Sequence, residues 1–69
     1  MKFAERLQEE RQKKGATQKE MAELLGVKLR AYQYYESGQH NPTLDSLVAL
    51  ADYFDVTTDY LLGRTDDPK

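Results

Sequence analysis

Apolar side chains recur every three or four residues in short stretches of this chain, and each stretch ends at a glycine or a turn-forming residue. That spacing is the period of an amphipathic α-helix, and no segment alternates over a useful length with the period of two typical of a strand. The pattern predicts five helices, over residues 2–14, 18–25, 28–37, 44–54 and 58–62. Because the helices are short and no loop is long, we expect a compact all-α globule rather than an elongated bundle.

The predicted helix ends carry capping residues. Two lysines precede Gly15, and cations in the last turn followed by a glycine are typical of a helix C-terminus. Residues 17–20 read Thr-Gln-Lys-Glu. This is a capping box, in which the threonine hydroxyl accepts from the third helical N–H and the glutamate reaches back to the threonine N–H. Thr43 and Thr57 are expected to cap the last two helices.

Composition restricts the chain to one small domain. It has 69 residues, of which 39% are hydrophobic and 32% are charged. No apolar run approaches the ~18–20 residues that span a bilayer, and the first residues, Met-Lys-Phe-Ala-Glu-Arg, lack the pattern of a signal peptide. With no cysteine there is no disulfide framework. We therefore expect a cytoplasmic protein with no membrane partner.

The residues give little support for an enzyme. The chain has no cysteine, a single histidine in a turn, no glycine-rich phosphate loop and no metal-ligand spacing. A core of this size is also too small to enclose a substrate pocket. We expect no catalytic residue, no metal site and no cofactor.

Charge is distributed unevenly along the chain, although the net charge is only −2. Residues 1–30 hold eight basic and five acidic side chains, a net of +3, whereas residues 31–69 hold two basic and seven acidic ones, a net of −5. Such a chain can present a basic face to phosphates while its other end stays acidic. The same distribution is compatible with two ordinary solvated surfaces.

The stretch from Gln18 to Ser37 carries the most specific motif. Two short predicted helices meet at Gly26, where glycine permits a tight turn, and Ala22 is small enough to let them approach closely. The residues on the inward side of this angle are Met21, Leu25, Val27, Tyr32 and Tyr35. A small residue, a glycine four positions later and apolar residues at these offsets indicate a helix-turn-helix.

Over residues 3–63 the chain resembles the phage-repressor family of helix-turn-helix proteins, the Cro/cI or xenobiotic-response-element type. The matching residues are Phe3, Arg6-Leu7, Arg11, Gly15, Thr17-Gln18, Met21-Ala22, Leu25-Gly26-Val27, Tyr35-Glu36, Gly38, Asn41-Pro42, Leu44, Leu47, Leu50-Ala51, Phe54-Asp55-Val56 and Asp59-Tyr60-Leu61-Leu62-Gly63. The resemblance implies a five-helix, lambda-repressor-like DNA-binding domain in residues 1–63. It also implies a transcriptional regulator, a repressor of the phage or prophage type, that binds an inverted-repeat operator as a dimer. The polar residues 64–69 are expected to form a tail or the start of a linker.

Three departures from the family pattern modify these expectations. Glu10 and Ala16 stand where the family usually has leucine, so we expect a thinner core at that corner. Lys28 stands where the family usually has a serine or threonine cap for the recognition helix. Because lysine has no acceptor, the N–H groups there stay open to water or a phosphate. The recognition helix is also more aromatic than most, with Tyr-Gln-Tyr-Tyr at residues 32–35.

The outward face of the third helix is the expected base-reading surface. Tyr32 and Tyr35 should point inward, and a recognition helix meets the major groove with its N-terminal residues. The candidate base contacts are Lys28, Leu29, Arg30, Gln33 and Tyr34. Arg30 suits guanine O6 and N7, Gln33 suits adenine N6 and N7, and Leu29 suits a thymine methyl. Each is also an ordinary residue for a solvated helix face.

Polar residues around the motif are candidates for phosphate contacts that set the register of the protein on DNA. They are Arg11, Lys14, Thr17, Gln18, Lys19, Ser37, Gln39, His40 and Asn41. Gln18 lies at the positive end of its helix and is better placed for a phosphate than for a base. His40 equally suits a plain surface position.

The resemblance further implies an ion pair between Arg11 and Glu36 beneath the DNA-binding surface. Arg11 lies on the inward edge of the first helix, and Glu36 lies at the end of the third. If the pair is buried, losing one partner leaves an unpaired charge at a cost of ~3–5 kcal/mol. Two independent surface charges are the alternative.

The last two helices are unusually apolar. The fourth has a broad apolar stripe that includes Leu44 and Val48. The fifth should both fold onto the fourth and lie near a dimer contact that includes Val56, Tyr60 and Leu61. A dimer of so small a chain should be weak without DNA. An alternative function on the same fold is an antitoxin-like or other protein-interaction module, and a steep loss of binding with salt would favour DNA.

Overall fold

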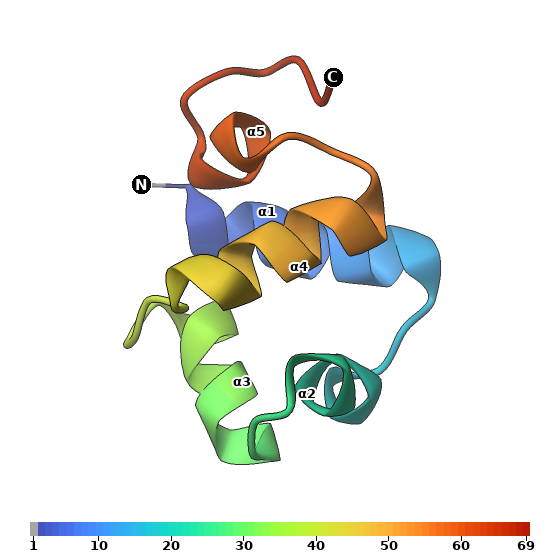
Figure 1. Ribbon diagram of the computed structural model, residues 1–69, viewed down its shortest axis with the longest axis vertical. Helices are drawn as coiled ribbons and strands as arrows, with labels where there is room; N and C mark the ends of the chain where they lie inside the picture. Colours follow the sequence, from blue (N-terminus) through green and yellow to red (C-terminus); the bar gives the residue numbers. More distant parts are fainter. Residues whose placement is uncertain (1) are drawn as a thin grey trace.

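Five helices and short connections make up residues 2–69, the part of the chain that the computed structural model describes (Figure 1). The helices are α1 (Phe3–Lys14), α2 (Gln18–Leu25), α3 (Leu29–Ser37), α4 (Leu44–Phe54) and α5 (Thr58–Leu62). Each predicted helix is present, with its ends within one residue of those expected, and residues 2–69 contain no strand. The all-α prediction is confirmed.

Capping residues mark the helix ends as the sequence predicts. The Thr17 hydroxyl accepts from the Glu20 N–H at 3.1 Å, and the Glu20 carboxylate accepts from the Thr17 N–H at 2.8 Å. The hydroxyls of Thr43 and Thr57 accept from N–H groups in the first turns of α4 and α5. Lys28 precedes α3 without a side-chain cap, as expected for a side chain that has no acceptor.

Each helix supplies one fully buried side chain to a common core. These side chains are Leu7 from α1, Met21 from α2, Tyr32 from α3, Leu50 from α4 and Leu61 from α5. In Figure 1, α1 and α4 lie in the middle of the molecule, with α2 and α3 at one end and α5 at the other. Helices this short are marginal alone in water, so the shared core is what holds the α2–α3 pair in place.

Part of the apolar stripe of α4 faces solvent instead of the core. Leu47, Leu50 and Phe54 are buried, but Leu44 is 80% exposed and Val48 is 51% exposed. Leu44 and Val48 are four residues apart and therefore share one side of the helix, at the edge of the stripe. The stripe is broader than the surface that the other helices cover.

Glu10 and Ala16 are both buried, although both positions lack the leucine that is usual in the family. Each residue is only 8% exposed. The Glu10 carboxylate lies 3.0 Å from Lys13 Nζ, and this hydrogen bond raises the pKa of Lys13. Arg11 Nη1 donates to the carbonyl oxygen of Ala16 at 3.0 Å. Polar contacts thus replace the apolar packing that two leucines would provide.

Arg6 is buried between α1 and the last residues of the chain. Its guanidinium donates to the carbonyl oxygens of Tyr60 and Thr65 and to the carboxylate of Asp66. The guanidinium carbon also lies 4.2 Å from the centre of the Tyr60 ring, a cation–π contact. One side chain of α1 therefore joins α5 to the segment that follows it.

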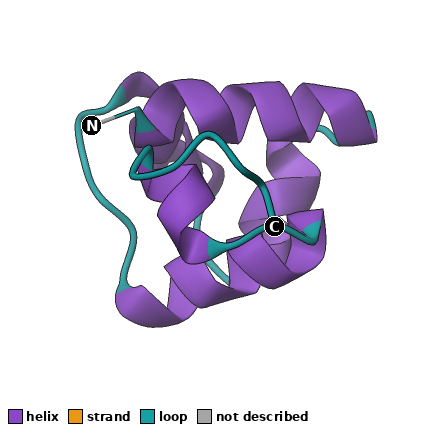
Figure 2. Cartoon of the chain, turned by 90° about the horizontal axis from the view of Figure 1, so that it is seen from above, coloured by secondary structure: helices purple, strands orange, loops and turns teal. Residues whose placement is uncertain are grey.

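Residues 64–69, which we call the C-terminal segment, lie against the helical body. Figure 2, seen from the α5 side, shows this segment crossing the helices. Besides the contacts of Arg6, the Thr57 N–H donates to the Pro68 carbonyl oxygen at 2.9 Å, and Lys69 pairs with Asp55. The sequence predicts a domain boundary at residue 63, and the C-terminal segment beyond it still packs against the helices.

Replacing Arg6 with lysine is expected to release the C-terminal segment while the five helices stay folded. Lysine keeps the positive charge but lacks the planar fork that reaches several acceptors at once. Hydrogen exchange at the Thr57 N–H reports the release. We expect it to accelerate roughly tenfold or more, because a hydrogen bond to a charged group contributes about 1.5–3 kcal/mol. Arg64→Lys is the matched control, and equal protection in both variants would show that Arg6 does not hold the segment.

Candidate nucleic-acid interface

α2 and α3 form a helix-turn-helix at the end of the molecule opposite α5 (Figure 1). Gly26, which ends α2, has a φ of 68°, a left-handed conformation that residues with a Cβ rarely adopt. The Val27 N–H donates to the Ala22 carbonyl oxygen at 3.0 Å across the turn. Ala22 is buried, as expected where two helices approach closely. The turn sets the direction in which α3 leaves α2.

One side of α3 is buried and the other faces solvent. Tyr32 and Tyr35 are buried, with their rings edge to face and the centroids 6.3 Å apart. The exposed residues at the start and along the outer side of α3 are Lys28, Leu29, Arg30, Gln33 and Ser37. Leu29 is 43% exposed, an apolar side chain on an otherwise polar face. Four of the five predicted base-reading residues are thus accessible on one helix face.

Tyr34, the fifth, is half-buried. Its ring packs edge-on against the His40 ring, with the centroids 4.9 Å apart. Its carbonyl oxygen accepts from the Ser37 hydroxyl at 3.1 Å and from the Gln39 N–H at 3.0 Å. These contacts order the loop after α3 against the end of the helix. A DNA contact by Tyr34, Ser37 or His40 stays a prediction.

The predicted phosphate-contacting residues lie on three parts of the surface: the end of α1, the start of α2, and the last residue of α3 with the loop that follows it. They are Arg11 and Lys14, then Thr17, Gln18 and Lys19, then Ser37, Gln39, His40 and Asn41. All are exposed except Gln18 and Arg11, which are half-buried. Their contacts with phosphate stay predictions.

Arg11 and Glu36 form the ion pair that the sequence predicts. Arg11 Nε lies 2.6 Å from Glu36 Oε2, and Arg11 Nη2 donates to Glu36 Oε1 at 3.2 Å. Two parallel hydrogen bonds of this kind are the strongest geometry for such a pair. The Glu36 side chain is only 5% exposed, so the pair is not two independent surface charges. It joins α1 to the last turn of α3.

Gln18 and Gln33 extend this cluster toward the surface. Gln18 Nε2 donates to Glu36 Oε1 at 3.1 Å, and Gln33 Nε2 donates to Gln18 Oε1 at 3.3 Å. The sequence predicts separate roles for the two glutamines but no contact between them. They lie on different helices, and no spacing rule relates positions 15 residues apart.

The neighbours of Glu36 keep its carboxyl group ionised. Burial raises the pKa of this group, but side-chain hydrogen bonds, the strongest from Arg11, outweigh that effect and lower the pKa below its ordinary value of 4.5. Burial raises the pKa of the nearby Tyr32 hydroxyl, and Glu36 raises it further. At neutral pH the carboxylate is therefore charged and the tyrosine is neutral.

The three predicted dimer residues are not equally accessible. Leu61 is 0% exposed and packs in the core of the single chain. The expectation that it contributes contact surface to a dimer is wrong, because a side chain without exposed surface offers none to a second copy. Val56 and Tyr60 are half-buried, and Tyr60 lies against the Arg6 guanidinium.

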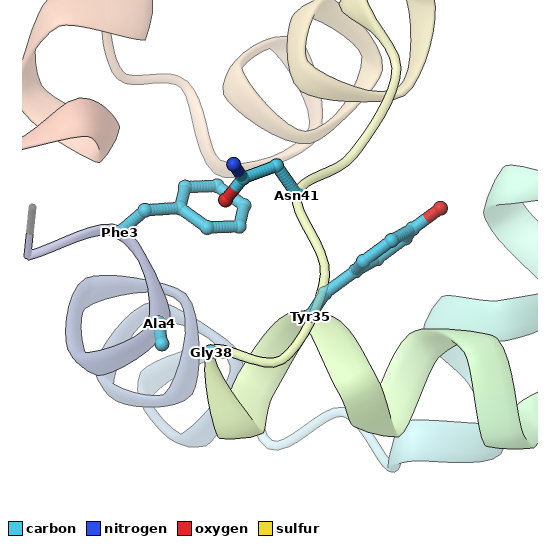
Figure 3. Close-up of a pocket in the computed structure, with 5 residues that line it drawn as sticks. All are labelled: Phe3, Ala4, Tyr35, Gly38 and Asn41. Carbon is cyan, nitrogen blue, oxygen red and sulfur yellow. The ribbon is translucent and has the colours of Figure 1, made fainter.

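A small pocket lies between α1 and the segment that follows α3. Its lining residues are Phe3, Ala4, Tyr35, Gly38 and Asn41, drawn in Figure 3, and its volume is about 190 Å³. Small-molecule sites are typically larger, about 300–1,000 Å³. Within residues 2–69, no three His, Cys, Asp or Glu side chains are grouped so as to hold a metal ion. No helix in that range is both long and apolar enough to cross a membrane.

Comparison with known proteins agrees with the class that this geometry defines, a helix-turn-helix DNA-binding domain. The helix-turn-helix family model matches residues 7–61, which include all of α2, α3 and α4. The chain therefore belongs to the helix-turn-helix family. The predicted resemblance to the phage repressors is also confirmed by individual relatives.

Two curated relatives illustrate this similarity. The cryptic phage CTXphi transcriptional repressor RstR of Vibrio cholerae is 42% identical over 64 residues, which cover 93% of this chain and 57% of the relative. The HTH-type transcriptional regulator ImmR of Bacillus subtilis is 42% identical over 69 residues, which cover 100% of this chain and 54% of the relative. The chain thus spans a little over half the length of these proteins.

Two solved structures share the fold. A transcriptional regulator from Listeria innocua superimposes with a TM-score of 0.85 and 39% identity, covering 88% of this chain and 57% of that one. The P22 c2 repressor in complex with a synthetic operator superimposes with a TM-score of 0.79 and 27% identity, covering 86% of this chain and 89% of that one. The predicted lambda-repressor-like architecture is confirmed by these likenesses.

Proposed function

We propose that this chain is a phage-type transcriptional repressor that reads duplex operator DNA with α3. The observation that carries the proposal is the accessible outer side of α3, where Arg30 and Gln33 are exposed while Tyr32 and Tyr35 are buried. A recognition helix enters the major groove with its N-terminal residues toward the base edges. The likeness to the P22 c2 repressor, which is solved in complex with a synthetic operator, supports operator binding. Acting on operator DNA, the protein works in the cytoplasm, without catalysis or a cofactor.

Each exposed residue of α3 is proposed to contact a different base or phosphate in the groove, according to its chemistry. Arg30 offers two parallel N–H donors to guanine O6 and N7, and Gln33 offers a donor and an acceptor to adenine. Leu29 packs on a thymine methyl, and Lys28 donates to a base or a phosphate at the start of the helix. Tyr34 is half-buried and offers the DNA the exposed part of its side chain.

Phosphate contacts from the elements before α3 and from its first turn hold α3 in register. The start of α2 presents Thr17 and Lys19 to the DNA backbone, and Lys14 lies at the end of the preceding helix. The uncapped N–H groups at the start of α3 are a further place for a phosphate oxygen. These contacts supply affinity that does not depend on base sequence.

A second copy of the chain is proposed to bind the other half of an inverted repeat. Val56, just before α5, and Tyr60, within α5, contribute the contact, since both retain exposed surface. So small an interface gives a weak dimer, and simultaneous binding of both copies to one operator strengthens it.

A protein-interaction module is the second candidate function, and the exposed leucine and valine of α4 favour it. Leu44 is 80% exposed and Val48 is 51% exposed, an apolar pair that a protein partner could cover. The two functions respond differently to salt. Binding through several phosphates weakens steeply as salt rises, whereas an apolar protein contact does not.

Lys19→Ala is expected to weaken binding to a specific operator and to random duplex about equally. Lys19 is exposed at the start of α2 and serves a phosphate, which carries no sequence information. The slope of log K against log salt should become shallower by about 0.9, the value for one phosphate contact. Titration of both duplexes at several salt concentrations measures this. Lys69→Ala removes the same charge at the far end of the chain and is the control. A loss confined to the operator would assign Lys19 to a base.

A further inference from the structure

The Glu36 carboxylate is the inner end of a hydrogen-bond chain that reaches the recognition surface. It accepts two bonds from Arg11 and a third, at 3.1 Å, from Gln18 Nε2. Gln18 Oε1 then accepts from Gln33 Nε2 at 3.3 Å. The hydrogen-bond chain thus runs from the buried Arg11–Glu36 pair through the half-buried Gln18 amide to the exposed Gln33 amide on α3.

The donors and acceptors in this hydrogen-bond chain can be arranged in only one direction. A carboxylate can accept hydrogen bonds but cannot donate them, so Gln18 must turn its NH₂ group toward Glu36. The Gln18 carbonyl oxygen then points the other way and can be paired only by a donor, which is the NH₂ group of Gln33. Gln33 is left with its carbonyl oxygen and one N–H for an external partner. A single buried charge therefore sets the orientation of two amides.

We infer that Glu36 and Gln18 are positioning residues that determine which base Gln33 prefers, an inference that rests on the proposed operator binding. An oriented Gln33 presents one acceptor and one donor. Adenine matches them with its N6 amino group and N7, whereas guanine presents two acceptors, O6 and N7, to the same pair of groups. A Gln33 amide that turns freely can direct both its N–H groups at guanine. The hydrogen-bond chain therefore favours adenine over guanine at the base pair that Gln33 reads.

The ionic state of Glu36 keeps the direction of the chain constant. Hydrogen bonds from Arg11 and Gln18 lower the pKa of the Glu36 carboxyl despite its burial, so no proton is present on it at neutral pH to turn the Gln18 amide round. Arg11 shares the role indirectly, because its two bonds hold the carboxylate in place. None of the three residues needs to touch the base that they help to select.

Operators that differ only at the base pair read by Gln33 test this inference. The operator is first obtained by selecting sites from a random duplex pool with the unmodified chain, and the base pair is the one at which Gln33→Ala changes the preference. Gln18→Ala should lower the adenine-over-guanine preference there about fivefold or more, the lower end of what one specific pair provides. In the Gln33→Ala background, Gln18→Ala should change that preference no further. Gln12→Ala, an exposed glutamine of α1, is the matched control and should leave it unchanged.

Glu36→Gln gives the second arm of the test. A neutral amide can donate as well as accept, so Gln18 can take either orientation, and the adenine preference should fall by a similar factor. If this variant fails to fold, Gln18→Ala still decides the matter, because it leaves the ion pair intact. Uniformly weaker binding by Gln18→Ala, with the base preference kept, would overturn the inference and leave Gln18 as a phosphate contact only. A selection that enriches no sequence would instead refute operator reading itself.

Discussion

Replacing Arg11 with methionine is expected to lower the free energy of unfolding by about 3–5 kcal/mol. Methionine has a similar length and an apolar stem, so the main loss is the charge that faces Glu36. The Glu36 side chain is 5% exposed and would be left as an unpaired buried carboxylate. Native domains are stable by only ~5–15 kcal/mol, and small ones lie at the low end, so the variant should be close to unfolding at ambient temperature. Urea unfolding of both proteins measures the difference.

Arg30→Met is the control for this substitution. Arg30 is exposed on the outer side of α3 and forms no ion pair within residues 2–69. The same change there should alter the free energy of unfolding by less than about 0.5 kcal/mol. If Arg11→Met is as mild as Arg30→Met, the Arg11–Glu36 pair does not stabilise the fold.

Acidification offers an independent check on the same pair. The pKa of Glu36 in the folded chain lies below its ordinary value of 4.5, so the unfolded chain binds the proton more readily. The stabilisation is therefore fully present above about pH 4.5 and is lost as the pH falls through the folded pKa. In Arg11→Met this part of the acid sensitivity should disappear, because burial disfavours the ionised carboxyl group and the hydrogen bonds from Arg11 no longer outweigh that effect.

Arg30→Ala is expected to reduce affinity for the specific operator by about 5- to 150-fold while binding to random duplex changes little. The range corresponds to the ~1–3 kcal/mol by which one two-bond contact discriminates against the wrong base. Arg30 is exposed one residue after the start of α3, where a recognition helix reaches the base edges. Titration of labelled operator and random duplex at one salt concentration gives both affinities.

Arg64→Ala provides the comparison for Arg30→Ala. Arg64 is exposed too, but it follows α5, away from the helix-turn-helix. Its loss should affect neither duplex by more than a small factor. Equal losses on operator and random duplex in Arg30→Ala would assign Arg30 to a phosphate rather than to a base.

The helices and their ends could be predicted from the sequence because local rules determine them. The Thr17–Glu20 capping box involves residues three apart, and the glycine at Gly26 ends α2 through its own backbone conformation. The inward direction of Tyr32 and Tyr35 also follows from helical spacing. Such features need no knowledge of which helices meet in space.

The features that could not be predicted depend on contacts between distant parts of the chain. The bond between Gln18 and Gln33 joins two helices and has no counterpart in spacing. The burial of Arg6 under the C-terminal segment pairs residues about sixty positions apart. Leu61 is an apolar residue of the last helix and is fully buried in the core. The sequence alone does not distinguish an apolar side chain that packs in the core of its own chain from one that packs against a second copy.

Site selection from a random duplex pool tests the central claim, that α3 reads a DNA sequence, most directly. The unmodified chain should enrich a single motif with a guanine in the part that Arg30 reads. If two copies bind together, the motif should be an inverted repeat with half-sites about 10 base pairs apart, one turn of the duplex. A pool that shows no enriched sequence after repeated rounds, with the protein folded throughout, would contradict sequence reading by α3.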